Sequence, residues 1–167
     1  MRVEEAMASS KLSLPPKVIL CPTDFSPASY EAVEAAVALA QHFGSELCLA
    51  YVVAPVPYLA DNPEYDFKVP EFEQMLQSSS KEKLQSVAEE YAGGKVPCQI
   101  VVANGRAADE IVNVAANQKA DLIVIATHGF TGWRHMAFGS VAEHVVRTAL
   151  CPVLTIRVGN SPASPHT

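Results

Sequence analysis

The sequence predicts an α/β domain built on a five-stranded parallel sheet with helices on both faces. Apolar runs of strand length alternate with amphipathic segments of helical period along the chain. The strand-like runs are apolar throughout rather than at every second position, which is typical of parallel strands that helices cover on both sides. The chain has 167 residues, enough for one domain with one core, and its sequence shows no internal repeat or second domain.

The first two predicted strands flank a helix whose two ends are marked in the sequence. The run KVILCP, residues 17–22, is the first strand, and ELCLAYVV, residues 46–53, is the second. Ser26 is a good N-cap because its side chain can accept a hydrogen bond from a backbone N–H group of the first turn. Gly44 is well placed to end the helix. The proline-rich stretch after the second strand, residues 54–70, predicts a long surface loop.

The remaining elements continue the alternation of helix and strand. In chain order we predict a helix over 71–92, a strand over 97–105, a helix over 106–120, a strand over 121–127, a helix over 140–149 and a strand over 151–158. Ser140 is expected to be the N-cap of the last helix. We therefore place the domain at residues 17–158, between a flexible leader (1–16) and a tail (159–167).

Composition argues against several classes of function. The net charge is −6, whereas a nucleic-acid surface needs clustered lysine and arginine, so we expect no nucleic-acid partner. No apolar stretch approaches the ~18–20 residues that cross a bilayer, and the first residues lack the apolar core of a signal peptide. We therefore expect no membrane association and a cytoplasmic location. The cysteines are far apart in sequence, so we expect reduced, buried thiols and no zinc site: Cys21, Cys48, Cys98 and Cys151.

Two strand orders suit five parallel strands, and they place a ligand crevice differently. Ligands of open α/β sheets bind beyond the carboxyl ends of the strands, where the strand order reverses. In the order 2-1-3-4-5, the loops after the first and third strands flank the crevice. In the order 3-2-1-4-5, the loops after the first and fourth strands flank it. The most polar, glycine-rich loop follows the fourth strand, so we prefer the order 3-2-1-4-5.

That loop, ATHGFTGWRHMAFGS, contains three of the chain's 8 glycines. Gly139 and Ser140 open the last helix, and the free N–H groups at a helix start attract phosphate. Gly129 permits close backbone approach from the opposite wall, and Thr127 and His128 carry further donors. The alternative is a turn that is shaped by its glycines and followed by a helix cap. These residues alone leave the two interpretations about even.

The turn after the first strand, PTDFS, contains a second candidate. It has no glycine, which excludes a dinucleotide fingerprint there, and the chain has no P-loop. Asp24 in this turn can accept hydrogen bonds from ribose hydroxyls or from an adenine amine. It can also help to cap the helix at Ser26, and the two roles do not exclude each other.

With PTDFS after the first strand and THG-x9-GSVAEHVVR-x3-CPVL near its end, the chain resembles the universal stress proteins over about residues 17–158. The resemblance implies a Rossmann-like fold of the adenine nucleotide alpha hydrolase type, with the sheet order 3-2-1-4-5. Nucleotide-binding members carry the pattern G-x2-G-x9-G-[ST]. Here Gly129 is the second glycine, Gly139 with Ser140 completes the pattern, and Ala126 stands where the first glycine is expected.

The resemblance also implies where an adenine nucleotide, ATP or AMP, would bind. The matching positions are Pro22, Thr23, Asp24 and Val52 for adenine and ribose, Gly105 near the ribose or phosphates, and Ala126, Thr127, His128, Gly129, Gly139, Ser140 and Val141 around the phosphates. Ala126 bars the positive φ that glycine accepts. The alternative function is therefore an interaction or signalling protein of the family's non-binding branch, although that branch also lacks the later Gly-Ser that this chain keeps.

We expect ATP hydrolysis to be slow or absent. Phosphoryl transfer needs metal ligands and a positioned nucleophile, and Asp24 is the one carboxylate that we can place at the site. A Mg²⁺ ion would be held mainly by the phosphates. A Ser140–His128–Asp24 hydrolase is disfavoured because the chain has no G-x-S-x-G elbow. A third hypothesis, a nucleotide-dependent enzyme with residues 54–70 as its lid, would need a measurable turnover to support it.

The leading hypothesis is a stress-response switch whose bound nucleotide alters its shape or its partners. Family members are commonly homodimers that pair their last strands. The resemblance therefore implies a homodimer through residues 153–158, an apolar edge that needs cover. The downstream partner and the stress signal are not readable from the residues.

Overall fold

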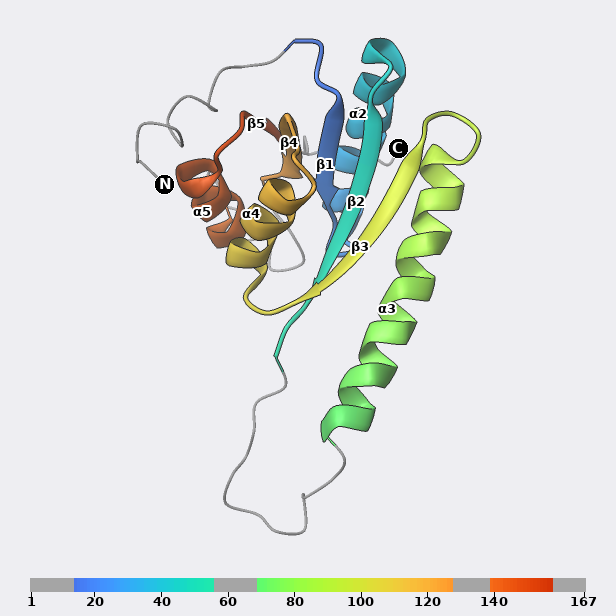
Figure 1. The fold of residues 1–167 in the computed structure, drawn as a ribbon, viewed down its shortest axis with the longest axis vertical. Helices are drawn as coiled ribbons and strands as arrows, with labels where there is room; N and C mark the ends of the chain where they lie inside the picture. The colour runs from blue at the N-terminus through green and yellow to red at the C-terminus, as the bar shows by residue number, and fades with distance from the viewer. Residues whose placement is uncertain (1–13, 56–68, 128–138, 158–167) are drawn as a thin grey trace, which may run out of the picture.

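The computed structural model describes residues 14–55, 69–127 and 139–157. Its centre is a five-stranded parallel sheet in the order β3-β2-β1-β4-β5, which confirms the predicted order (Figure 1). The central strand is β1, where Ile19 pairs with Leu47 of β2 on one side and with Leu122 of β4 on the other. The strands are β1 Val18–Pro22, β2 Glu46–Val53, β3 Cys98–Asn104, β4 Leu122–Ala126 and β5 Val153–Ile156.

In the described part of the chain, two helices cover each face of the sheet. The helices are α2 Pro27–Phe43 and α3 Val69–Ala92 on one face, and α4 Ala107–Asn117 and α5 Ser140–Thr148 on the other. Ile19 and Cys21 of β1 are buried on the side of α2 and α3, whereas Leu20 is buried on the side of α4 and α5. Because both faces are buried, the strands have no polar alternation, as the sequence indicated.

Both ends of α2 are as predicted. Ser26 is the N-cap, and its Oγ accepts a hydrogen bond from the Ser29 N–H group at 3.2 Å. Gly44 follows the last turn with φ 69, in the left-handed region that favours glycine. Its N–H group donates to the carbonyl oxygen of Ala40, which satisfies one of the free carbonyls at the helix end.

The start of α5 and the length of β5 differ from the prediction. Gly139, not Ser140, is the N-cap of α5, with extended backbone at φ −71 and ψ 153. Ser140 is already the first helical residue, so its side chain does not occupy the capping position. The strand β5 is Val153–Ile156, shorter than the predicted 151–158, and Val158 lies outside the described residues.

Helix α3 extends past the end of the sheet (Figure 1). Its later part packs on the core through Leu84 and Val87, which are buried. Near its start, Phe72 is 46% exposed and Met75 is 58% exposed. The apolar stripe of α3 is therefore longer than the sheet surface that covers it. Neither α3 nor any other described helix is long and apolar enough to cross a membrane.

The four cysteines are free, as predicted. Cys21 and Cys48 are fully buried on adjacent strands, as predicted, whereas the prediction of full burial was wrong for Cys98 and Cys151, which are half-buried near the ends of the sheet's outer strands. Burial is the main cause that raises the pKa of the Cys21 thiol, and it raises the pKa of the Cys48 thiol to about 12. Buried thiols with raised pKa values stay protonated at neutral pH and behave as small apolar groups of the core.

Candidate functional site

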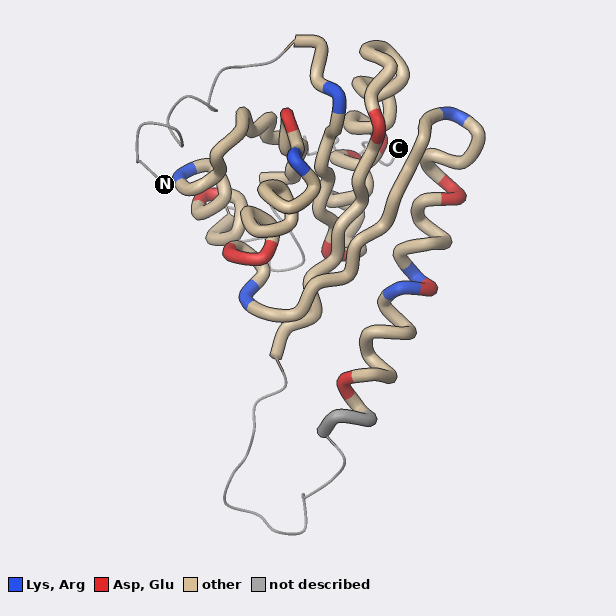
Figure 2. Tube along the Cα trace, in the orientation of Figure 1, with Lys and Arg blue, Asp and Glu red and all other residues tan. Residues whose placement is uncertain are grey.

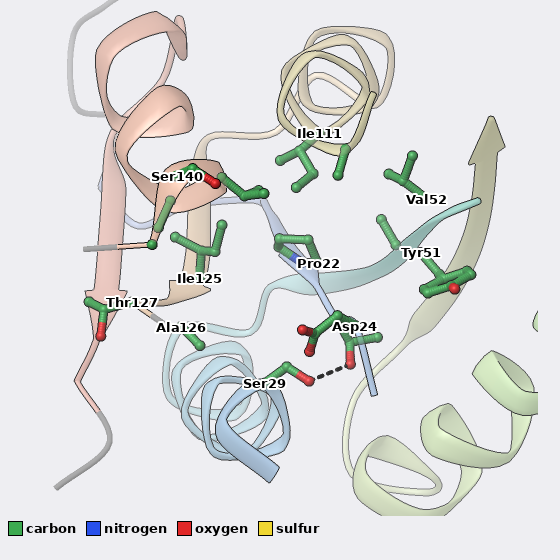
Figure 3. Close-up of a pocket in the computed structure, with 16 residues that line it drawn as sticks. Pro22, Asp24, Ser29, Tyr51, Val52, Ile111, Ile125, Ala126, Thr127 and Ser140 are labelled. Carbon is green, nitrogen blue, oxygen red and sulfur yellow. Dashed lines mark hydrogen bonds between the residues drawn. The ribbon is translucent and has the colours of Figure 1, made fainter. Parts of the chain in front are cut away.

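A cavity of about 220 Å³ lies beyond the carboxyl ends of β1, β2 and β4. Pro22 from β1, Val52 from β2 and Ala126 from β4 line it (Figure 3). Because β2 and β4 lie on opposite sides of β1, the cavity sits where the strand order reverses. This is the crevice that the order 3-2-1-4-5 predicts.

Nine of the twelve residues that the sequence predicted for the site line this cavity. They are Pro22, Thr23, Asp24, Val52, Ala126, Thr127, Gly139, Ser140 and Val141. Gly105 does not line the cavity, and His128 and Gly129 lie outside the described residues. The structure thus brings together residues that are more than a hundred positions apart in the chain. That these residues bind a nucleotide remains a prediction.

The sequence missed seven residues that also line the cavity. They are Ser29, Ala50, Tyr51, Ala107, Ile111, Ile125 and Ala142. Helical spacing carried a signal for two of them, because Ala107 and Ile111 are four residues apart on one face of α4. No pattern pointed to Tyr51, which lines the cavity near the end of β2 and also contacts the opposite core.

Local hydrogen bonds shape the turn that brings Asp24 to the cavity. Asp24 Oδ1 accepts a hydrogen bond from the Ser26 N–H group at 3.0 Å, and another from Ser26 Oγ. Thr23 Oγ1 accepts from the Phe25 N–H group at 3.0 Å and shares a hydrogen bond of 2.8 Å with Ser29 Oγ (Figure 3). Asp24 therefore stabilises the start of α2, one of the two roles predicted for it. A contact with ribose or adenine remains a prediction.

Two helices begin at the cavity without a side-chain cap. The N-cap residues are Arg106 for α4 and Gly139 for α5. A guanidinium group only donates hydrogen bonds and glycine has no side chain, so neither residue can accept one from the first turn. Ala107 and Ser140, the first residues of these helices, both line the cavity. The first N–H groups of a helix carry a partial positive charge. The part of the cavity between α4 and α5 therefore offers N–H groups to an anion, although the same first turns also carry the carboxylates of Asp109, Glu110 and Glu143.

The two flanks of the glycine-rich segment are joined at the cavity. The Gly139 N–H group donates to the carbonyl oxygen of Thr127 at 2.6 Å. The Thr127 N–H group in turn donates to the carbonyl oxygen of Ile156 in β5 at 3.0 Å. Thr127 is 3% exposed, so this junction is fixed between β4, β5 and the start of α5.

Comparison with known proteins gives the family. The model of the universal stress protein family matches residues 16–157, almost the whole described domain. The chain belongs to the universal stress protein family. Universal stress protein MJ0531 of Methanocaldococcus jannaschii is 38% identical over 144 residues, which are 84% of this chain and 82% of that protein.

Solved universal stress proteins share the fold. Protein MJ0577 of Methanocaldococcus jannaschii matches with a TM-score of 0.74 at 26% identity, over 87% of this chain and 98% of that one. UspA of Lactobacillus plantarum matches with a TM-score of 0.72 at 27% identity, over 84% of this chain and 97% of that one. These relatives are of nearly the same length as the domain, so the comparison covers the whole of it.

Ala126 is the position at which this universal stress protein departs from the predicted nucleotide motif. It is the last residue of β4, pairs with Ile156 of β5 and is 8% exposed. In the described chain, the non-glycine residues with positive φ are Phe25 and Lys119, so Ala126 has an ordinary strand backbone. In this structure the backbone at position 126 is therefore one that alanine readily adopts. The difference from glycine seen here is one methyl group in the cavity wall.

Gly105 has a conformational reason to be glycine. It lies in the turn between β3 and α4 with φ 144, and its N–H group donates to the carbonyl oxygen of Val53 at 3.0 Å. A Cβ at this position would lie 2.8 Å from Cγ of Glu110. The turn alone explains the glycine, and a contact with a ligand remains a prediction.

Asp24 is the one charged residue among the described residues that line the cavity. Near the starts of α4 and α5, His144 Nε2 lies 3.0 Å from Asp109 Oδ1, and Arg106 Nη1 lies 3.7 Å from Asp109 Oδ2. The first contact joins the two helices that begin at the cavity, and the second lies within the start of α4. Over the rest of the described chain, acidic and basic residues are interspersed (Figure 2).

Proposed function

We propose that this universal stress protein binds an adenine nucleotide, ATP or AMP, at the cavity and acts as a nucleotide-dependent switch in the stress response. One observation carries the proposal: an apolar slot and two uncapped helix starts meet at the same cavity. Adenine and ribose would occupy the slot beside Pro22, Asp24 and Val52. The phosphates would lie against the start of α5 at Gly139–Val141.

The slot suits a flat, mostly apolar group. Its walls are small or branched apolar side chains from β1, β2, β4 and α4, namely Pro22, Ala50, Val52, Ile111 and Ile125. At about 220 Å³, the cavity is smaller than the roughly 300–1,000 Å³ of most complete ligand pockets. This size supports a nucleoside inside the slot with its phosphates extending out of it. The helix starts lie at the side where negative charge would then be placed.

Most of the oxygen ligands of a bound Mg²⁺ ion would come from the phosphates of the nucleotide. In the part of the chain that the structure describes, no group of three or more His, Cys, Asp or Glu side chains could hold a metal ion. A Mg²⁺ ion would therefore be held mainly by the phosphates, with Asp24 as the carboxylate of the cavity wall. Because a fast ATPase also needs a positioned nucleophile and metal ligands from the protein, we propose slow or no hydrolysis.

Some solved family members contain a bound nucleotide, which agrees with the proposal, but their low identity to this chain gives it little support. One solved universal stress protein is described as a complex with cAMP, at 23% identity and a TM-score of 0.58. Another, from Arabidopsis thaliana, is described with AMP bound, at 20% identity and a TM-score of 0.52. At these identities the likeness extends to the fold alone. The support for a nucleotide in this chain is its own cavity.

The first test is mass spectrometry of the small molecules that freshly purified protein releases on denaturation, followed by calorimetry with ATP and Mg²⁺. We expect ATP or AMP to be released or to bind. Ser140→Ala should weaken the affinity about tenfold, the value of one hydrogen bond to a charged group. Thr148→Ala is the matched control, since the Thr148 hydroxyl donates to the carbonyl oxygen of His144 on the same helix, away from the cavity. An equal loss of nucleotide affinity in both variants would contradict the placement of a phosphate at the start of α5.

A second candidate function follows from the methyl group of Ala126, which lines the cavity where the nucleotide motif has glycine. If that methyl group closes the site to nucleotide, the chain is an interaction or signalling protein of the family. This candidate predicts no released nucleotide and no heat of binding with ATP and Mg²⁺. Restoring the motif with Ala126→Gly should then create binding.

A further inference from the structure

Phe25 combines a strained backbone with a nearly buried ring. It follows Asp24 directly and has φ 64, a left-handed conformation that residues with a Cβ rarely adopt. Its N–H group is held by Thr23 Oγ1 at 3.0 Å, and the residue is 9% exposed. The strain therefore belongs to the same turn that brings Thr23 and Asp24 to the cavity. Strain of this kind persists when the surroundings hold it, and it concentrates at functional sites.

The ring of Phe25 contacts both the cavity wall and helix α3. Its centroid lies 4.5 Å from that of Tyr51, which lines the cavity from β2. On α3, Lys83 Nζ lies over the ring, 4.3 Å from the centroid, at the distance of a cation–π interaction. One ring thus links a wall of the cavity to a helix that does not line it.

Lys83 lies where α3 meets the core. In the described part of α3, the next residue, Leu84, is the first that is fully buried. The start of the helix, where Phe72 and Met75 are exposed, projects beyond the sheet (Figure 1). The contact between Phe25 and Lys83 therefore lies next to the first fully buried position of α3. A change in this contact acts on the helix beside the residue that anchors it in the core.

We propose that Phe25 couples occupancy of the cavity to the docking of α3, through Tyr51 on one side and Lys83 on the other. The coupling rests on the proposed nucleotide binding. A ligand in the cavity touches the wall that Thr23, Asp24 and Tyr51 form, so it restrains the turn and the ring of Phe25. A restrained ring holds Lys83 more firmly, and α3 docks more tightly. Because coupling between two sites is reciprocal, docking of α3 must strengthen nucleotide binding by the same factor by which the nucleotide strengthens docking, and loss of the contact with Lys83 removes this gain.

The test is hydrogen–deuterium exchange of peptides across residues 72–92, with and without ATP and Mg²⁺, combined with calorimetry on the same full-length samples. In the wild-type protein, ATP should slow exchange in α3. Lys83→Met keeps the apolar stem and removes the ammonium group, so it should abolish this extra protection. It should also lower ATP affinity by up to about two- to fivefold, the full strength of an exposed cation–π contact. Lys81→Met removes the same charge two residues away, beside β3 rather than Phe25, and should change neither measurement.

The outcomes separate this coupling from the proposed function. If wild-type protein binds ATP but exchange in α3 does not change, the coupling is overturned and nucleotide binding stands. The coupling is also overturned if Lys83→Met and Lys81→Met lose the same affinity, because the effect is then one of net charge. Failure of the wild-type protein to bind ATP overturns both proposals.

Discussion

Ala126 stands where the nucleotide motif has glycine, Gly105 matches a family position near the ribose or phosphates, and the backbones of the two residues differ. Ala126 lies in a strand, where its methyl group takes up space in the cavity wall. Gly105 has φ 144, a backbone conformation that residues with a Cβ rarely adopt. The motif could be read from the sequence, but a motif does not say which reason applies. The reason depends on the backbone angle φ of each residue, and φ could not be predicted from the neighbouring sequence.

Gly105→Ala should lower the free energy of unfolding by about 1–3 kcal/mol, since the residue would be held in a region of φ that a Cβ strongly disfavours. The measurement is urea unfolding of the two proteins. The same substitution in a Glu110→Ala background is the control, because a Cβ at position 105 would lie 2.8 Å from Cγ of Glu110. We expect a similar loss in both backgrounds. A loss that disappears in the Glu110→Ala background would assign it to the contact and not to the backbone.

At the scale of the elements, the sequence predicted the starts and ends that side chains determine. The predicted caps of α2, Ser26 and Gly44, are confirmed, because a serine side chain can make the cap hydrogen bond and glycine readily adopts the positive φ. Ser140 was wrong as the N-cap of α5, because the backbone becomes helical one residue earlier than the side-chain pattern indicated. Tyr51 and Ile111 were missed as cavity residues because their roles depend on elements that are distant in the sequence.

The edge strand β5 carries the prediction of a homodimer. It pairs with β4 on one side, and Leu154 on it is 40% exposed. If two copies cover this edge, Leu154→Asp should convert the dimer to a monomer, since a buried and unpaired carboxylate opposes association. Sedimentation velocity measures the outcome. Met75→Asp, at a residue that is 58% exposed on α3, should leave the dimer intact. A monomeric wild-type protein, or a dimer that survives Leu154→Asp, would contradict an interface at β5.

For the whole molecule, the order of the sheet could be predicted because polar residues gather after particular strands. Thr23 and Asp24 follow β1, and the glycine-rich segment follows β4, so both were expected at the reversal of strand order. The resemblance to the family supported the same order. The meeting of the starts of α4 and α5 at one cavity, and the projection of α3 past the sheet, could not be predicted. Both depend on how segments far apart in the chain pack on the sheet.

The buried thiols make the stability of the whole molecule depend on pH. Burial raises the pKa of the Cys48 thiol to about 12, whereas a thiol in an unfolded chain titrates near pH 8.5. Because the folded pKa is the higher one, this contribution is fully present below about pH 8.5 and is lost as the pH rises toward the folded value. Each such thiol should lower the free energy of unfolding by about 1.4 kcal/mol per pH unit in this range.

Urea unfolding between pH 8 and pH 10.5 measures this slope. Cys48→Ala is expected to be less stable than the wild type at pH 8, because it leaves a small cavity in the core. Its stability should nevertheless fall less steeply with pH, by about 1.4 kcal/mol per pH unit, since one buried thiol is missing. Lysine and tyrosine titrate equally in the two proteins, so they cancel in the comparison. Parallel slopes would mean that Cys48 ionises as readily in the folded core as in the unfolded chain.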